Sequence, residues 1–150
     1  MQFGDYIMWN KFKLAAFSLA LLSNSASAAM VCENATVRIP LYDGAEKIEQ
    51  RKVCFSADSE KFISPSCYSR KKNCAAIEAA LKGTALNTHG GEVGTPLSSA
   101  CTEAGGQAQQ ITLEWRGHAY RTSRCLVGDS FIDLGTFFSI SLDPMKYLVE

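Results

Sequence analysis

The chain has 150 residues, of which 47% are hydrophobic and 20% are charged, and its 15 Lys and Arg residues balance its 15 Asp and Glu residues. This composition is typical of a globular protein and argues against intrinsic disorder and against a bundle of transmembrane helices. A formal net charge of zero also argues against a broad nucleic-acid-binding surface, because such a surface needs an excess of Lys and Arg.

The first 28 residues have the pattern of a secretory signal peptide. Lys11 and Lys13 precede an apolar run over residues 14–22, and Ala26-Ser27-Ala28 supplies the small residues of a cleavage site. The run is far shorter than the roughly 20 apolar residues that a transmembrane helix needs. We therefore expect cleavage near Ala28 and a soluble product, located in the periplasm or secreted.

One exported domain is expected over residues 29–150, with translation starting at Met1 or at Met8. All six cysteines lie in this range, and an even number of cysteines in an exported chain is typical of disulfide bonds. No Cys-x-x-Cys pair occurs and the chain has only two histidines, so we expect no metal site and no cofactor. The cysteines are Cys32, Cys54, Cys67, Cys74, Cys101 and Cys125.

Two runs of alternating apolar residues on either side of Asp43-Gly44 predict a β-hairpin. A register in which paired residue numbers sum to 86 places Val31 opposite Phe55 on the apolar face. The same register places Cys32 opposite Cys54 and so predicts the first disulfide. The alternating side chains are Val31, Val37, Ile39 and Leu41 before the turn, and Val53 and Phe55 after it.

Two short helices are expected next. Asn73 is a candidate N-cap for the first, which ends at Lys82-Gly83, and Thr95-Pro96 begins the second, which ends at Gly105-Gly106. Residues 87–94 are rich in glycine and predict a flexible loop between the helices. The apolar stripes are Cys74, Ile77 and Leu81 in the first helix, and Leu97, Ala100, Cys101 and Ala104 in the second.

A second hairpin is expected around the turn Arg116-Gly117, with paired residue numbers that sum to 233. Cys125 then lies opposite residue 108, within reach of the helix that carries Cys101. Cys67 and Cys74 remain to close a small loop. The facing side chains are Ile111, Leu113 and Trp115 on one strand, and His118, Tyr120 and Thr122 on the other.

Two more short strands are expected over residues 131–134 and 137–142, around Gly135-Thr136. The resulting order of elements predicts an α+β domain, in which an antiparallel sheet of hairpins carries two short helices on one side and is reinforced by disulfides.

The string Gly128-Asp129-Ser130-Phe131-Ile132-Asp133-Leu134-Gly135 resembles the nucleophile block of the GDSL family of serine esterases and lipases. The resemblance implies that Ser130 is a nucleophile, which needs a base. In that family the Asp and His of the triad follow the block, whereas no histidine follows Ser130 in this chain. His118 is the candidate base for this alternative; in the other interpretation the string is a polar turn between strands.

A second resemblance covers residues 95–138. The pattern is similar to that of a small domain of unknown function in exported bacterial proteins, some of which are labelled haemolysins. In that domain an Asn stands at the position of Thr95, and a further cysteine and a Glu-Trp pair stand where this chain has residues 131–134. The resemblance implies a small exported bacterial domain. The residues that carry it are Thr95-Pro96, Cys101, Gly105-Gly106, Cys125 and Gly128-Asp129-Ser130.

Residues 47–72 are asymmetric in charge, with seven basic side chains against three acidic ones. A basic patch of this kind can contact an anionic surface or an acidic partner, and the alternative is a solvated loop. The candidate patch is Lys61, Arg70, Lys71 and Lys72.

These features favour a non-enzymatic, disulfide-stabilised domain that binds a protein or an envelope component, with no nucleic acid and no membrane span. The alternatives are a small serine esterase that uses Ser130 and an inhibitor that presents a rigid loop to a hydrolase. Residues 87–94 look too rich in glycine to form such a loop.

Overall fold

The structure is a computed structural model that describes residues 29–56, 58–69, 74–83 and 95–145. These residues form six strands and four helices. The strands are β1 (Val31–Pro40), β2 (Glu46–Ser56), β3 (Lys61–Ile63), β4 (Gln107–Trp115), β5 (His118–Val127) and β6 (Ser130–Asp133). The helices are α1 (Pro65–Tyr68), α2 (Ala75–Lys82), α3 (Pro96–Glu103) and α4 (Leu134–Leu142).

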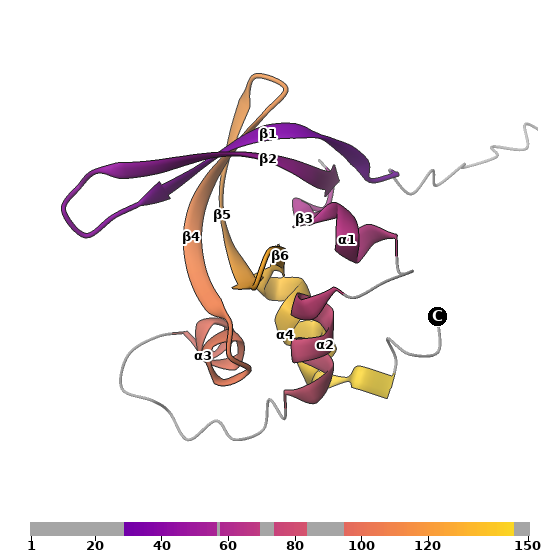
Figure 1. Cartoon of the computed structure of the whole chain (residues 1–150). Coiled ribbons are helices and arrows are strands. Elements are labelled where there is room, and N and C mark those ends of the chain that lie inside the picture. The colour runs from indigo at the N-terminus through magenta and orange to yellow at the C-terminus, as the bar shows by residue number, and fades with distance from the viewer. Residues whose placement is uncertain (1–28, 57, 70–73, 84–94, 146–150) are drawn as a thin grey trace, which may run out of the picture.

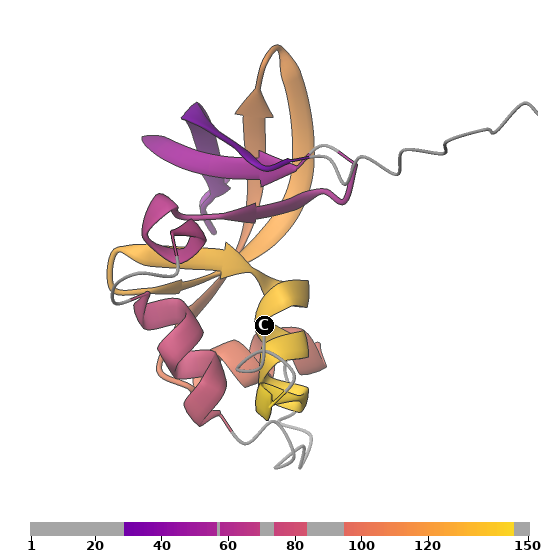
Figure 2. The same cartoon turned by 90° about the vertical axis from the view of Figure 1, so that its right-hand side faces the viewer.

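The strands close into a barrel in the order β1-β2-β3-β6-β5-β4, with every pairing antiparallel. Two contacts complete the closure: β1 pairs with β4 over Thr36–Arg38, and β3 pairs with β6 through Ile63 and Ile132. The long hairpins β1–β2 and β4–β5 cross each other, helices α2, α3 and α4 gather at one end of the barrel, and α1 lies apart from them beside β3 (Figures 1 and 2).

The fold class predicted from the sequence is therefore wrong. The chain is mostly β, with a closed barrel in place of an open sheet covered by helices on one side. The closing contacts join segments that lie far apart in the sequence, and the periodicity of side chains within each segment carries no information about them. Closure pairs strand edges that an open sheet would leave exposed.

Both predicted hairpins and their registers are confirmed. Val31 pairs with Phe55 in the first hairpin, and Trp115 pairs with His118 in the second. The second turn has positive φ at Arg116 (49°) and Gly117 (78°), which is the backbone of a two-residue turn matched to the twist of the strands.

The two predicted helices are also found, as α2 and α3. The side chain of Thr95 caps α3 by accepting a hydrogen bond from the amide of Ser98. At α2 the capping position is held by Cys74, whose Sγ accepts from the amide of Ile77. The expected cap Asn73 and the expected loop at 87–94 lie outside the described residues.

The segment after β6 corrects a further prediction, because residues 137–142 belong to helix α4 and not to a strand. Asp133 ends β6 and caps the helix, since its Oδ1 accepts a hydrogen bond from the amide of Thr136 at 2.8 Å. The helix buries Leu134, Phe137 and Ile140, which recur at the spacing of one helical face.

The buried side chains form two clusters. The barrel core consists of Ala35, Val37, Ile39, Val53, Phe55, Phe62, Ile111, Leu113, Trp115 and Phe131. The helical core, between the helices and strands β5 and β6, consists of Cys67, Cys74, Ala76, Ala80, Cys101, Cys125, Ile132, Leu134, Phe137 and Ile140.

The six cysteines form the three predicted pairs: Cys32–Cys54, Cys67–Cys74 and Cys101–Cys125. The first joins β1 to β2, the second joins α1 to the cap of α2, and the third joins α3 to β5. Three disulfides are compatible with an extracellular or periplasmic location. Within the part of the chain that the structure describes, no helix is long and apolar enough to cross a membrane.

Candidate functional site

Ser130, the candidate nucleophile, is buried and engaged with backbone groups. Its Oγ donates a hydrogen bond to the carbonyl of Val127 at 3.0 Å and accepts one from the amide of Ala76 at 2.9 Å. These two bonds tie the start of α2 to the turn between β5 and β6. The hydroxyl therefore acts as a structural link between two elements.

His118, the candidate base, is exposed at the other end of β5 from Ser130. Ser130 pairs with Val127 at the end of β5, and His118 begins the same strand. The nine residue steps between them correspond to about 30 Å of strand. The structure thus does not bring the two residues together.

The candidate basic patch is described only in part. Lys61 is exposed on β3, whereas Arg70, Lys71 and Lys72 lie outside the described residues. Among the residues that are described, no group of three His, Cys, Asp or Glu side chains is placed to hold a metal ion.

A different feature, the outer part of the hairpin β1–β2, presents the most exposed large apolar side chains of the barrel. Residues 39–48 extend beyond the last pairing with β4 at Arg38, and we call them the arm. Figure 1 shows the arm projecting to one side of the crossing point of the two hairpins. Tyr42 at its tip is fully exposed, and Leu41 and Ile48 are 45% and 55% exposed.

The turn at the tip of the arm is held by three hydrogen bonds. The amide of Leu41 donates to the carbonyl of Ala45 at 2.8 Å, and the amide of Gly44 donates to the carbonyl of Leu41 at 3.1 Å. The carboxylate of Asp43 accepts from the amide of Ala45. Gly44 adopts a φ of 81°, which a residue with a side chain rarely adopts. The apolar tip is therefore carried by an ordered turn.

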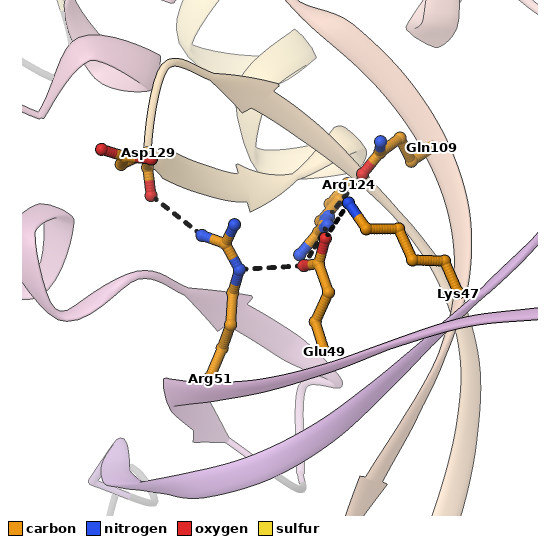
Figure 3. A network of polar contacts seen from close by, with 6 residues as sticks. All are labelled: Lys47, Glu49, Arg51, Gln109, Arg124 and Asp129. Atoms are coloured by element: carbon orange, nitrogen blue, oxygen red, sulfur yellow. Dashed lines mark hydrogen bonds and ion pairs between the residues drawn. The ribbon is translucent and has the colours of Figure 1, made fainter.

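A buried ionic network connects the root of the arm to the hairpin β4–β5 (Figure 3). Arg124 on β5 is fully buried, and its guanidinium donates to Glu49 on β2 at 3.0 Å and to Gln109 on β4 at 2.8 Å. Glu49 also accepts a hydrogen bond from Arg51 at 2.9 Å and forms an ion pair with Lys47 at 2.9 Å. The network joins three strands and fixes the direction in which the arm leaves the barrel.

The protonation states of this network are set by opposing effects. Burial raises the pKa of Glu49, but hydrogen bonds from Lys47 and Arg124 and the charges of Arg124 and Arg51 lower it, and the resulting pKa is about 2. Burial lowers the pKa of Arg124, while the hydrogen bond and the charge of Glu49 raise it. At neutral pH the network is therefore a carboxylate among guanidinium and ammonium groups.

The other strand of the arm, β1, is anchored by ion pairs at the surface. The Nε of Arg38 on β1 donates to Glu114 on β4 at 2.6 Å, and its Nη1 donates to Glu46 on β2 at 3.2 Å. These three side chains are more exposed than the pair Arg124 and Glu49, so their ion pairs contribute less to stability. Both strands of the arm are thus anchored to the barrel by charged side chains at its root.

No protein-family model, no characterised protein and no solved structure matches this chain. The geometry of the described residues is therefore the ground for any functional assignment.

The arm is not among the candidate sites predicted from the sequence. The alternating pattern predicts Leu41 on the buried face with Ile39, whereas β1 ends at Pro40 and Leu41 is exposed at the start of the turn. A signal was present: Leu41-Tyr42 directly precedes Asp43-Gly44, and apolar residues inside a turn lie at the surface.

Proposed function

We propose that the protein is a non-enzymatic exported domain, located in the periplasm or secreted, that binds a protein partner through the tip of the arm. The observation that carries the proposal is the fully exposed ring of Tyr42 beside the exposed Leu41, on a hairpin that is fixed at both its turn and its root. Export is supported by the leader pattern in residues 1–28 and by the compatibility of three disulfides with an oxidising compartment.

The chemistry of the tip indicates what the partner offers. Tyr42 combines a large apolar ring with a hydroxyl, and such residues are often the energetic centre of an interface when they enter a pocket. Because the arm is ordered before binding, little conformational entropy is lost on association. The partner is therefore a protein with an apolar pocket that has a hydrogen-bond acceptor or donor for the phenol.

Site-specific photo-crosslinking tests this proposal. A benzophenone amino acid is placed at position 42, and in a control at position 68, because Tyr68 on α1 is a second exposed tyrosine away from the arm. We expect one crosslinked partner from position 42 in cells that make the protein, and none from position 68. The same crosslinks from both positions, or none from position 42, would contradict the proposal.

Binding of the isolated partner then gives the magnitude. Tyr42→Ala should weaken the affinity by about 2 kcal/mol or more, which is roughly thirtyfold. Tyr68→Ala is the matched control and should leave the affinity unchanged. An equal loss in both variants would remove the arm from the interface.

A stiff, projecting hairpin also favours the inhibitor alternative, since an inhibitor must present an ordered loop to the cleft of its target. The arm supplies the ordered turn that this role requires. If the crosslinked partner is a hydrolase, we expect the wild-type protein to inhibit it and Tyr42→Ala to inhibit it much less. A hydrolase that is bound with unchanged activity would limit the function to binding.

A further inference from the structure

Strand β5 has a neighbouring strand on both sides over only part of its length. It pairs with β4 over residues 118–126, but β6 pairs only with residues 124–127. Among the described strands, residues 118–123 therefore have a neighbour on one side only, and we call them the free edge of β5. Figure 1 shows the hairpin β4–β5 extending past the place where β1 and β2 cross it. The free edge is distinct from the arm, and its chemistry is not used in the proposed function.

The pairing of β5 shows which backbone groups point to its open side. The hairpin β4–β5 closes with the pair Trp115 and His118 around a two-residue turn, so the backbone of His118 hydrogen-bonds to β4. Every second residue of β5 then bonds to β4, and the residues between them point to the opposite side. Cys125 and Val127 use that side to pair with β6. Beyond the end of β6, three residues direct their amides and carbonyls to this side: Ala119, Arg121 and Ser123.

These backbone groups are available to a ligand. Ala119 and Arg121 are exposed, and Ser123 is partly exposed. In the part of the chain that the structure describes, no backbone hydrogen bond outside the strand ladders engages these three residues. A hollow of about 820 Å³ is lined by Ser123 on one side and by the start of α4 on the other. The free edge therefore has space beside it for an extended chain, and an unpaired edge is a template for such a chain.

The free edge of β5 lacks the features that protect strand edges from pairing. Strand β2 also has one open side, over residues 46–53, but this segment carries Lys47 and Lys52. Lysines and prolines on an edge discourage pairing with a further strand. Residues 118–123 contain neither lysine nor proline. The sequence of the free edge is thus compatible with the addition of a strand.

The side chain of Arg121 differs from those of the other described arginines. It has no hydrogen-bond or ion-pair partner among the described residues. Each of the others forms an ion pair with a glutamate, and they are Arg38, Arg51, Arg116 and Arg124. An exposed guanidinium group without a partner is a good donor to a carboxylate, because it can bind both carboxylate oxygens at once.

The surroundings of Arg121 also favour a carboxylate. Arg121 lines a groove of about 540 Å³ together with the hydroxyl side chains of Thr112 and Ser123. Glu46 lies in the same groove, but its carboxylate is already paired with Arg38 at 3.2 Å. The charge that is left without a partner in this groove is therefore positive, and it is complementary to an acidic side chain.

The two faces of the free edge determine which side chains a bound peptide carries. In an antiparallel pair the residue opposite Arg121 lies on the same face as Arg121, so an acidic residue fits there. The residues on either side of it lie opposite Tyr120 and Thr122, on the face of the barrel core, where the ring of Tyr120 lies 4.7 Å from that of Phe55 between centroids. Apolar side chains fit these two positions. A second copy of the free edge does not supply the acidic residue, because residues 118–123 contain no Asp or Glu.

We propose that the free edge of β5 binds an extended peptide segment of another protein by antiparallel strand addition. The backbone of the peptide bonds to Ala119, Arg121 and Ser123. An acidic residue of the peptide pairs with Arg121, and apolar residues before and after it cover Thr122 and Tyr120.

Titrations of the oxidised protein followed by amide NMR test the proposal. The probe is acetyl-Thr-Val-Glu-Val-Thr-amide, and the control has Lys in place of Glu. We expect the probe to shift the amides of Ala119, Arg121 and Ser123 and to slow their hydrogen exchange, with an affinity at least about tenfold higher than that of the control.

Two N-methylated probes test whether the peptide pairs as a strand. A methyl group on the nitrogen of the central Glu removes a hydrogen bond to β5 and should weaken binding at least about tenfold. A methyl group on the nitrogen of the following Val points away from β5 and should change the affinity less than about threefold. Recognition through side chains alone would not distinguish between the two probes.

Variants of the protein test the role of the charge. Arg121→Gln should weaken binding of the probe at least about tenfold and leave binding of a peptide with Gln in place of Glu unchanged. Arg121 is exposed, so this variant should fold. Lys52→Gln is the matched control, because it removes an exposed cation from the open edge of β2, and it should bind the probe like the wild type.

Four results would overturn the proposal: equal affinity for the Glu and Lys peptides, equal affinity for the two N-methylated probes, equal losses in Arg121→Gln and Lys52→Gln, or no shift at about 5 mM probe. Shifts of the same amides that depend on protein concentration without any peptide would assign the edge to a second copy of the chain, and would also overturn it. None of these results bears on the crosslinks from position 42, so failure of the free edge and failure of the arm are distinguishable.

Discussion

The barrel core and the helical core are both buried, but they are stabilised by different chemistry. In the barrel core the ring of Phe55 lies 4.9 Å from that of Trp115 and 4.7 Å from that of Tyr120, measured between centroids, and Phe62 packs near Phe131 at 6.0 Å. In the helical core, two of the three disulfides lie among alanines and a few larger side chains.

The lengths of the elements explain this difference. The barrel core is enclosed by long strands that hydrogen-bond to one another, so large rings between them are sufficient. Helices α2, α3 and α4 have only eight or nine residues each, and helices this short are not stable in isolation. Disulfides supply the constraint that hydrogen bonds within such short helices cannot.

The largest expected effect comes from the barrel core. Phe55→Ala removes a fully buried ring that contacts two other aromatic residues, and should reduce the free energy of unfolding by about 3–5 kcal/mol. Urea denaturation of the oxidised protein measures this loss. A loss below about 1 kcal/mol would mean that the rings are not the main source of stability there.

Removing the disulfide of the helical core should have the next largest effect. Cys101 and Cys125 are 24 residues apart, and replacing both by alanine should cost about 3 kcal/mol through the entropy of the unfolded chain. Hydrogen exchange should be accelerated most in α3. Equal acceleration throughout the barrel would show that the two cores do not behave as separate units.

Acid should destabilise the barrel, because the barrel strands contain the buried ion pair of Glu49 and Arg124 and the helical core does not. The pKa of Glu49 is about 2 in the folded protein, below its ordinary value of 4.5, so its ion pairs stabilise the fold fully above about pH 4.5. This contribution is lost as the pH falls from about 4.5 to about 2. Amides of β2 and β5 should lose protection in that range, after correction for the intrinsic pH dependence of exchange.

The variant Glu49→Gln mimics the protonated state at neutral pH. It leaves the buried Arg124 with a neutral partner and should cost about 2–3 kcal/mol. Glu114→Gln is the control, because its partner Arg38 is partly exposed, and it should cost less than about 1 kcal/mol. Similar losses in the two variants would contradict the role of burial.

The smallest effect concerns the close packing around the third disulfide. A Cβ atom at Gly106 would lie 2.7 Å from Sγ of Cys125 and 2.8 Å from Sγ of Cys101, so Gly106→Ala should cost about 1–2 kcal/mol. Gly135→Ala, where the nearest atom is 3.4 Å away, is the control and should be close to neutral. Thermal melting compares the two, and equal melting temperatures would show that the disulfide can shift.

The sequence predicts the local parts of this fold well. Alternation of apolar residues determines which face of a strand is buried, and a shift of one residue would expose Val37 or bury charges, so both registers follow from it. The register that pairs Cys32 with Cys54, and the one that places Cys125 opposite Ala108, lead to disulfides that the structure contains.

The parts that sequence reasoning missed depend on contacts or on competing local preferences. Phe137, Phe138 and Ile140 favour a strand by residue type, but the cap at Asp133 and the burial of one helical face outweigh that preference. Strand β3 has three residues, too few for alternation to be visible. Closure of the barrel, and with it the direction of the arm, depends on contacts distant in sequence.

The closing contacts also set the order in which the chain can fold as it is synthesised. Residues 31–56 are synthesised before the other strands of the barrel and contain a complete hairpin, which the disulfide Cys32–Cys54 links in the folded protein. One barrel partner of this hairpin, β3, follows directly after it in the chain, whereas the other partner, β4, and the strands β5 and β6 come much later. Until β4 and β5 have been synthesised, Val53 and Phe55 cannot be buried in the barrel core. The growing chain therefore exposes hydrophobic surface to which chaperones can bind. Because the first strand of the barrel pairs with β4, the barrel can close only after its later strands have been synthesised.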